Sequence, residues 1–266
     1  MEALLHWLHE QPFALSFLLV VTAFVVPTLL GGHLLQPYIA RMLKRESDAN
    51  TIAGVALNTI SLFYAVLLGL LSLAVFQNYT YADTTTELEA ASIIALGRNA
   101  HMYPAPLADQ IRTILVAYLD EEIGPGWKMQ KSGQASPKAA ALVDQLGHLL
   151  QGFNPRTTGE QALHENTLRL FSDFVDRRQQ RLDASETNIP GILWFVVLTG
   201  AVVNAVALWL FDLHRQTHLV IGTCLSLFIG IIVYMLAMLD DPFSGYSGLL
   251  PDSLISARAQ LPVDRQ

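Results

Sequence analysis

Two groups of acidic residues are the first features of this chain whose type and spacing suit chemistry. Asp120, Glu121 and Glu122 are consecutive at the end of a predicted helix, where clustered carboxylates indicate either solvated charge or a cation site. Glu87 and Glu89 lie beyond the end of a long apolar run. They predict either an acidic ring in an oligomer or ion pairs with basic residues of neighbouring helices, and the sequence leaves both alternatives open.

The sequence contains no recognisable catalytic constellation. It has no Gly-rich phosphate loop, no HExxH motif, no nucleophile elbow and no paired carboxylates inside its apolar runs. The single cysteine, Cys224, excludes an intrachain disulfide and a cysteine-based metal site. We therefore expect no enzyme, no catalytic residue, no metal and no other cofactor.

A stripe of small and polar residues on one apolar run is the strongest candidate for a functional surface. Residues 51–77 contain no charged residue and are long enough to cross a bilayer as a helix. At about 100° per residue, the small and polar side chains share one narrow arc, opposite large apolar ones. The residues of this polar stripe that we expect to line a pore are Thr51, Asn58, Ser61, Ala65, Gly69, Ser72 and Phe76.

The polar stripe has two physical interpretations. Small residues let two helices approach closely, and hydroxyl or amide groups then bond across the contact. Alternatively the stripe lines a wet path, because polar groups at membrane depth are retained against protein or water. In that case Phe76, the one bulky member, is expected to form an apolar constriction. The sequence does not separate the two interpretations.

The composition indicates a membrane part and an aqueous part in one chain. Of the 266 residues, 52% are hydrophobic and 15% are charged, which is too apolar for an ordinary soluble domain and too charged for a pure membrane bundle. The formal charge of −7 argues against nucleic acid as a partner, because phosphate binding needs a clustered basic surface.

The order of apolar and amphipathic stretches predicts an all-α integral membrane protein with four transmembrane helices. Helices 1 and 2 are expected within residues 1–77 and helices 3 and 4 within 189–240. Residues 78–188 predict a soluble, extramembrane helical bundle inserted between spans 2 and 3, and residues 241–266 a polar tail. The N-terminal run lacks the basic start and cleavage site of a secretory signal, so we expect a retained first span.

Turn and cap residues divide the predicted bundle into about four helices. The run Gly124-Pro125-Gly126 is expected to end the second helix, with a loop over 127–137. Ser136 is expected to cap the third helix with Pro137 at its first position. Thr158 and Gln161 are expected to form a capping box at the start of the fourth.

The distribution of basic residues favours cytoplasmic short loops, which would make the bundle and both termini extracytoplasmic. The basic residues of those loops are Arg41, Lys44, Arg45 and Arg215. The arginines at 177, 178 and 181 lie near the third span on the bundle side and favour the opposite orientation, although charges beside a long translocated domain count for less.

Several stretches together resemble the bacterial bestrophin-like family of uncharacterised membrane proteins. They are FYAVLLGLLSLAVFQNY with the later Glu89-Ala90 and Gly97-Arg98 pairs, Trp127 and Met129 with KSGQASPKAAALVDQL, DRRQQRLDASETNIPGILW, and LDDPFSGYSGLLPDSL. The resemblance covers nearly the whole chain. It implies a remote similarity to bestrophins, which are pentameric anion channels with four spans per subunit and a helical domain outside the bilayer.

The resemblance also implies the partners and the location of the chain. It implies a homo-oligomer, a pentamer if bestrophin-like, that contacts the lipid bilayer of the bacterial inner membrane and small ions. Asp240 and Asp241 begin a segment similar to the one in which bestrophin acidic residues help bind calcium. Here residues 244–247 are Ser-Gly-Tyr-Ser instead of further acids.

Two further departures from bestrophins concern function. Bestrophin necks are lined by large apolar residues of the second span, whereas the polar stripe is mostly small, and bestrophin soluble domains are cytosolic. We expect an ion channel with a pore lined by the second span. The alternative is a non-conducting sensor or scaffold whose bundle binds a ligand or partner and whose stripe only packs helices.

Overall fold

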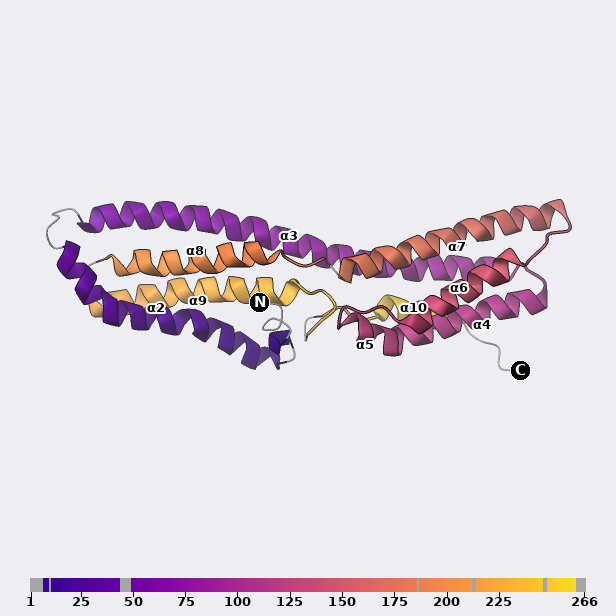
Figure 1. Cartoon of the computed structure of the whole chain (residues 1–266), viewed down its shortest axis with the longest axis horizontal. Helices are drawn as coiled ribbons and strands as arrows, with labels where there is room; N and C mark the ends of the chain where they lie inside the picture. Colours follow the sequence, from indigo (N-terminus) through magenta and orange to yellow (C-terminus); the bar gives the residue numbers. More distant parts are fainter. Residues whose placement is uncertain are drawn as a thin grey trace. The chain divides into compact units, whose positions relative to one another are not determined.

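The computed structural model is all-helical over the residues that it describes, which are 7–9, 11–43, 49–185, 187–211, 214–245 and 248–261 (Figure 1). Lys44 and Arg45, used in the orientation argument, lie outside them. The chain forms two compact units. The first, called the span unit, comprises Met1–Gln77, Asn188–Asp241 and Gly245–Ser247. The second, called the bundle unit, comprises Asn78–Thr187, Pro242–Ser244 and Gly248–Gln266.

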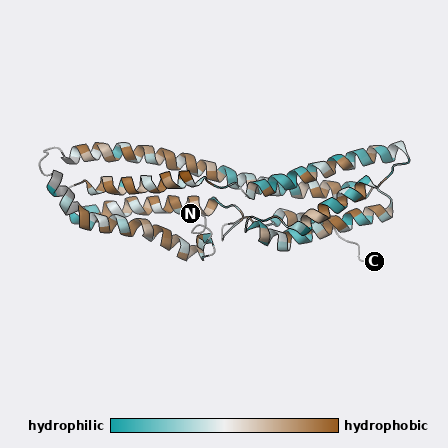
Figure 2. Ribbon diagram, viewed as in Figure 1, coloured by the Kyte–Doolittle hydropathy of each residue, from teal (hydrophilic) through white to brown (hydrophobic). Residues whose placement is uncertain are grey.

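Four helices are long and apolar enough to cross a membrane, which confirms the predicted number of candidate spans. They are α2 (Phe13–Leu43), α3 (Ala49–Ala100), α8 (Gly191–Trp209) and α9 (Arg215–Leu239). Figure 2 shows hydrophobic residues along α2, α8, α9 and the N-terminal part of α3. The helix α3 is unbroken over 52 residues, so the second candidate span continues as a helix beyond residue 77.

Small residues bring the helices of the span unit close together. Gly230 of α9 lies against α2, where an added Cβ would be 3.2 Å from the Cα of Val21. Gly200 of α8 receives the ring of Tyr64, whose hydroxyl donates to the Val197 carbonyl at 3.0 Å. Close backbone approach and bonds to backbone carbonyls are the usual means of helix association in lipid.

The bundle unit packs the C-terminal part of α3 with five further α-helices and one π-helix. These are α4 (Ala105–Glu121), the π-helix η1 (Glu122–Gly126), α5 (Trp127–Gln130), α6 (Pro137–Gln151), α7 (Thr158–Ser185) and α10 (Asp252–Gln260). Its core contains fully buried apolar side chains from α3, α4, α6 and α7, including Ile93, Leu115, Leu146 and Phe174. Burial of these apolar faces is the main stabilising contribution to the unit.

The run Gly124-Pro125-Gly126 does not end a helix, so this prediction is wrong. The chain widens into η1, in which the amide of Trp127 donates to the carbonyl of Glu122, and α5 follows directly. The buried Trp127 indole donates to the Leu249 carbonyl at 3.1 Å and lies edge-on against Phe243. Tertiary packing of this side chain therefore overrides the local helix-breaking signal.

The C-terminal region also differs from the predicted polar tail. Residues 252–260 form α10, and Leu254, Ala257 and Leu261 are buried in the core of the bundle unit. The Leu261 side chain packs against Gly97, in the space that a Cβ at position 97 would occupy. The apolar positions are only three and four residues apart over nine residues, which is too short a repeat to stand out in a turn-rich sequence.

One of the two predicted helix caps is confirmed and the other is displaced by one residue. Ser136 caps α6 by accepting the Ala139 amide at 3.2 Å, with Pro137 at the first position. The cap of α7 is not the predicted pair Thr158 and Gln161. Thr157 accepts the amide of Glu160 at 3.2 Å, and the Glu160 carboxylate accepts the Thr157 amide at 3.3 Å, which completes a capping box.

This cap makes a testable prediction with a neighbouring control. We expect Thr157→Ala to destabilise the protein by about 1 kcal/mol, because the Glu160 amide at the start of α7 loses the hydroxyl that accepts its hydrogen bond. Thr158→Ala should change stability by less than about 0.5 kcal/mol, since the exposed Thr158 side chain makes no cap. Denaturant unfolding of the full chain in detergent, followed by circular dichroism, measures both; equal losses would contradict the assignment.

Candidate functional site

The polar stripe of α3 lies mostly on the uncovered side of the helix. Thr51, Asn58, Ala65, Gly69 and Phe76 are exposed in the single chain, and Phe76 is 57% exposed. The adjacent arc, formed by Tyr64, Leu68, Leu71 and Val75, is buried in the core of the span unit. The packed protomer therefore uses the apolar arc and leaves most of the stripe without cover.

Ser61 is the member of the stripe that packs helices within the chain. Its hydroxyl donates to Oδ1 of Asn204 at 2.7 Å, and Nδ2 of Asn204 donates to the Gly200 carbonyl at 2.9 Å. Ser72, at the same edge, is half-buried. Our sequence analysis missed Asn204, although a lone amide inside the apolar run of α8 is itself a signal of a contact at membrane depth.

Glu87 and Glu89 do not act together in the structure. Glu87 is exposed, whereas Glu89 is fully buried in the bundle unit. Nε of Arg181 and the hydroxyl of Tyr118 both donate to the Glu89 carboxylate. For Glu89 the structure therefore shows the ion-pair alternative, and a carboxylate buried inside one chain does not suit an acidic ring.

Arg181 is the centre of a buried polar cluster. Its guanidinium is fully buried, pairs with Glu89 and with Glu122 at 3.1 Å, and donates to Oε1 of Gln130. Arg178 lies 3.8 Å from Glu122. Two carboxylates and two guanidinium groups therefore balance in charge in a region from which water is largely excluded, which offsets part of the cost of burying them.

The pKa values in this cluster follow burial and the neighbouring charges. Burial raises the pKa of Glu122, and Arg181 opposes this shift only in part. Burial alone would lower the pKa of Arg181, but Glu89 and Glu122 more than offset it and raise the pKa. Burial and then Glu89 raise the pKa of Tyr118 well above its usual range. The arginine is thus permanently charged, and the Glu122 carboxyl binds a proton at higher pH than an ordinary glutamate does.

The three consecutive acids 120–122 point to three different partners. Nε of Arg258 donates to Asp120 at 2.7 Å, Lys138 pairs with Glu121 at 2.8 Å, and Glu122 joins the Arg181 cluster. Glu121 and Glu122 are buried, so solvated charge describes only Asp120. No shared cation site forms, because each carboxylate already has its own cation.

Asp240 bonds to the residues at and just before the start of α8. Its Oδ1 accepts the Ile189 amide at 2.6 Å and its Oδ2 accepts Nε1 of Trp194 at 3.1 Å. Calcium takes six to eight oxygen ligands, and Asp241 is the only other acid within residues 240–247. Among the described residues no group of three His, Cys, Asp or Glu side chains is placed to hold a metal ion. The segment does not fit a calcium site.

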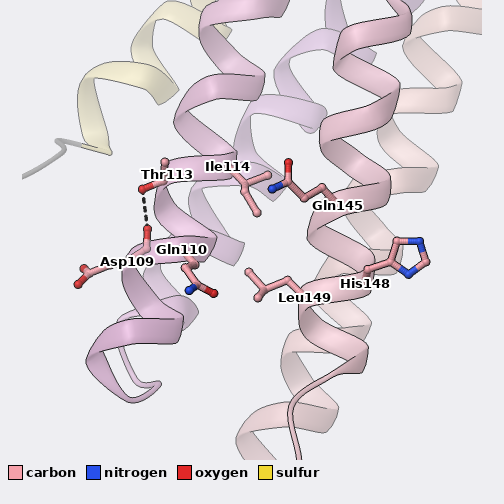
Figure 3. Close-up of a pocket in the computed structure, with 7 residues that line it drawn as sticks. All are labelled: Asp109, Gln110, Thr113, Ile114, Gln145, His148 and Leu149. Carbon is pink, nitrogen blue, oxygen red and sulfur yellow. Dashed lines mark hydrogen bonds between the residues drawn. The ribbon is translucent and has the colours of Figure 1, made fainter.

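An open groove between α4 and α6 is a second candidate site, and the sequence analysis missed it. Figure 3 shows side chains of α4 facing those of α6 across this space of 540 Å³. Its polar side chains are Asp109, Gln110, Thr113, Gln145 and His148. Thr113 donates to the Asp109 carbonyl at 2.8 Å, and Arg112 pairs with the Asp109 carboxylate at 3.3 Å. In Figure 3 the amides of Gln110 and Gln145 face the space between the helices, whereas the His148 ring points away from it, so the two amides are the groups that suit a small polar ligand.

The fold and these sites define an all-helical, multi-pass membrane protein. A family model described as the bestrophin-like domain matches residues 22–254. The chain therefore belongs to the bestrophin-like family, which confirms the resemblance found in the sequence. A search of curated proteins gave no match.

Solved structures share the fold at low sequence identity. A crystal structure of a mutant bacterial bestrophin homologue from Klebsiella pneumoniae is 12% identical, with a TM-score of 0.70 over 91% of this chain and 97% of that one. Another structure of the Klebsiella homologue, phased with zinc, is 15% identical, with a TM-score of 0.63 over 94% and 97%. A mutant of a protein described as a membrane protein is 13% identical, with a TM-score of 0.66 over 89% and 97%.

The buried arginine makes a prediction about stability. Arg181→Met should destabilise the protein by about 3–5 kcal/mol, because it leaves two buried carboxylates without their shared cation. Arg258→Met is the matched control: its ion pair with Asp120 is partly exposed, so the loss should be at most about 1 kcal/mol. Unfolding of the full chain in detergent measures both, and similar losses would show that Arg181 does not have this role.

The raised pKa of Glu122 predicts a pH dependence of known sign. Between the ordinary glutamate pKa and the raised one, the folded state holds a proton that the unfolded chain has released. This contribution to stability is therefore present at low pH and is lost as the pH rises through that interval. Glu122→Gln should flatten this part of the profile, whereas Asp120→Asn should not. Unfolding midpoints measured across the acidic range test this; a profile unchanged by Glu122→Gln would rule it out.

Proposed function

We propose that this protein is a homo-oligomeric ion channel in which α3 of each subunit lines a common pore. The observation that carries the proposal is the uncovered polar stripe beside a fully packed apolar arc on the same span. A polar face at membrane depth needs protein or water against it. A ring of copies around an axis supplies both, because each stripe faces the axis and the polar groups meet water.

Family membership supports the same arrangement. Bestrophins are anion channels with several copies around one pore, so a pentamer that conducts small anions is the arrangement this family favours. Thr51, Asn58 and Ser72 would supply hydroxyl and amide groups along the path, and the exposed ring of Phe76 would form the apolar constriction. Ser61 would line only the edge of the path, since it also bonds to Asn204.

The bundle unit belongs outside the bilayer in this proposal. Figure 2 shows hydrophilic residues spread over α7 and other helices of that unit. Exposed Arg41 and Arg215 at the loop ends of α2 and α9 favour a cytoplasmic location for the short loops and an extracytoplasmic one for the bundle and termini. The protein would then lie in the bacterial inner membrane, and Glu87 would be an exposed acid near the base of the bundle.

Ion flux through liposomes containing the purified protein tests the proposal. We expect Asn58→Leu to lower the flux by removing a polar group from the path, and Phe76→Ala to raise it by widening the constriction. Phe63→Ala is the control, because Phe63 is 72% exposed on the opposite face of α3 and should leave flux unchanged. An absence of flux, or flux that responds equally to Phe63→Ala and Phe76→Ala, would exclude this pore.

The groove between α4 and α6 favours a second candidate, a non-conducting sensor whose bundle binds a polar ligand. In that case the polar stripe of one copy packs against a helix of another copy and lines no pore. The number of subunits in detergent distinguishes the candidates. A closed ring of four or more copies supports the channel, whereas a dimer with Asn58 buried between two α3 helices supports the sensor.

A further inference from the structure

A long apolar groove runs along the span unit between α2, α8 and α9. It has a volume of 410 Å³, which lies in the range of ligand-binding pockets. Its wall on α8 extends from Trp194 to Trp209. Fifteen residues of helix correspond to about 22 Å, a large part of the hydrocarbon thickness of about 30 Å.

Small side chains give the groove its depth. Ala201 and Ala205 of α8 and Ala23 of α2 line its middle, between the indoles of Trp194 and Trp209 at its two ends. Pro27 of α2 also lines it. Because the surrounding helices are packed through glycines elsewhere, this gap is a local feature of the α2 and α8 faces rather than general loose packing.

The polar atoms in the wall of the groove already have partners. Nε1 of Trp194 donates to Asp240 at 3.1 Å, and Nε1 of Trp209 donates to the Thr28 carbonyl at 2.9 Å. The Thr28 hydroxyl donates to the Phe24 carbonyl at 2.8 Å. The groove therefore offers hydrocarbon to its occupant, and water or a polar ligand would lose hydrogen bonds on entering.

The two ends of the groove differ in charge. At the Trp209 end, Gly32 separates the Trp209 ring from the ring of His218, and Arg215 lies one turn before His218 on α9. Arg215 is exposed, and no Asp or Glu occurs among the described residues 13–43 or 214–239. At the Trp194 end, Asp240 and its neighbour Asp241 are acidic. Among the described residues, charge therefore favours an anionic headgroup at the Trp209 end over the Trp194 end.

We propose that this groove binds one acyl chain of an anionic phospholipid, with the lipid phosphate at the Arg215 end. The groove lies within helices that cross the membrane, so lipid is the medium that reaches it. An apolar space of this size left unfilled would forfeit dispersion contacts along its whole wall. An acyl chain restores these dispersion contacts and needs no hydrogen-bond partner. This proposal does not depend on whether the protein conducts ions.

Lipid retention by the full-length protein tests this site. Native mass spectrometry counts the lipids bound to protein purified from membranes that contain phosphatidylglycerol. In a second measurement, the protein is transferred into vesicles of phosphatidylglycerol with brominated chains, and quenching of tryptophan fluorescence is recorded. Ala205→Phe fills the middle of the groove and should lose most of the bound lipid and of the quenching. Val206→Phe is the control, because Val206 is 40% exposed on the neighbouring face and does not line the groove.

The headgroup assignment has its own comparison. Arg215→Gln should weaken retention of phosphatidylglycerol and leave retention of phosphatidylcholine unchanged. Equal retention of phosphatidylglycerol by wild type, Ala205→Phe and Val206→Phe would overturn the site. Crosslinks from residue 205 to a second copy, found without bound lipid, would also overturn it, because they would show that protein side chains fill the groove. If Ala205→Phe does not fold, Ala201→Val is a smaller replacement in the same wall; it should lower lipid retention, and unchanged retention would contradict the site.

Discussion

The buried guanidinium of Arg181 is the polar constraint that links most elements of the bundle unit. A fully desolvated cation costs several kcal/mol unless it is paired and hydrogen-bonded. Its partners come from different elements: Glu89 from α3, Glu122 from η1 and Gln130 from α5, with Tyr118 of α4 completing the bonds to Glu89. One side chain of α7 therefore fixes the position of four other elements.

The π-helix is explained by the same constraint. Glu122 and Gln130 both bind Arg181. Trp127 lies between them in the chain and packs in the core, with its ring centroid 5.9 Å from Cζ of Arg181. The wider turn of the π-helix, which contains Pro125, gives successive side chains directions different from those in a regular α-helix. The helix-breaking sequence and the polar cluster are therefore parts of one arrangement.

The features that the sequence predicted correctly depend on residues close together in the chain. The four candidate spans follow from the length of apolar runs, and the Ser136 cap follows from a local motif. The features that were missed depend on distant partners. The separate partners of residues 120–122 come from α6, α7 and α10, and the burial of α10 depends on a space beside Gly97. The Thr157 cap was missed because two adjacent threonines carry the same local signal.

The polar stripe illustrates the limit of periodicity most directly. An angular pattern identifies which residues share a face, but only packing shows whether that face is covered. Ser61 is used inside the chain and Asn58 is not, although both lie on the same stripe. Within α3, which contains no proline, Tyr64 and Ser61 fix the rotation of the span, and Glu89 fixes the rotation of the same helix in the bundle unit. Each part of α3 is therefore oriented by contacts within its own unit, which the angular pattern of the sequence alone does not specify.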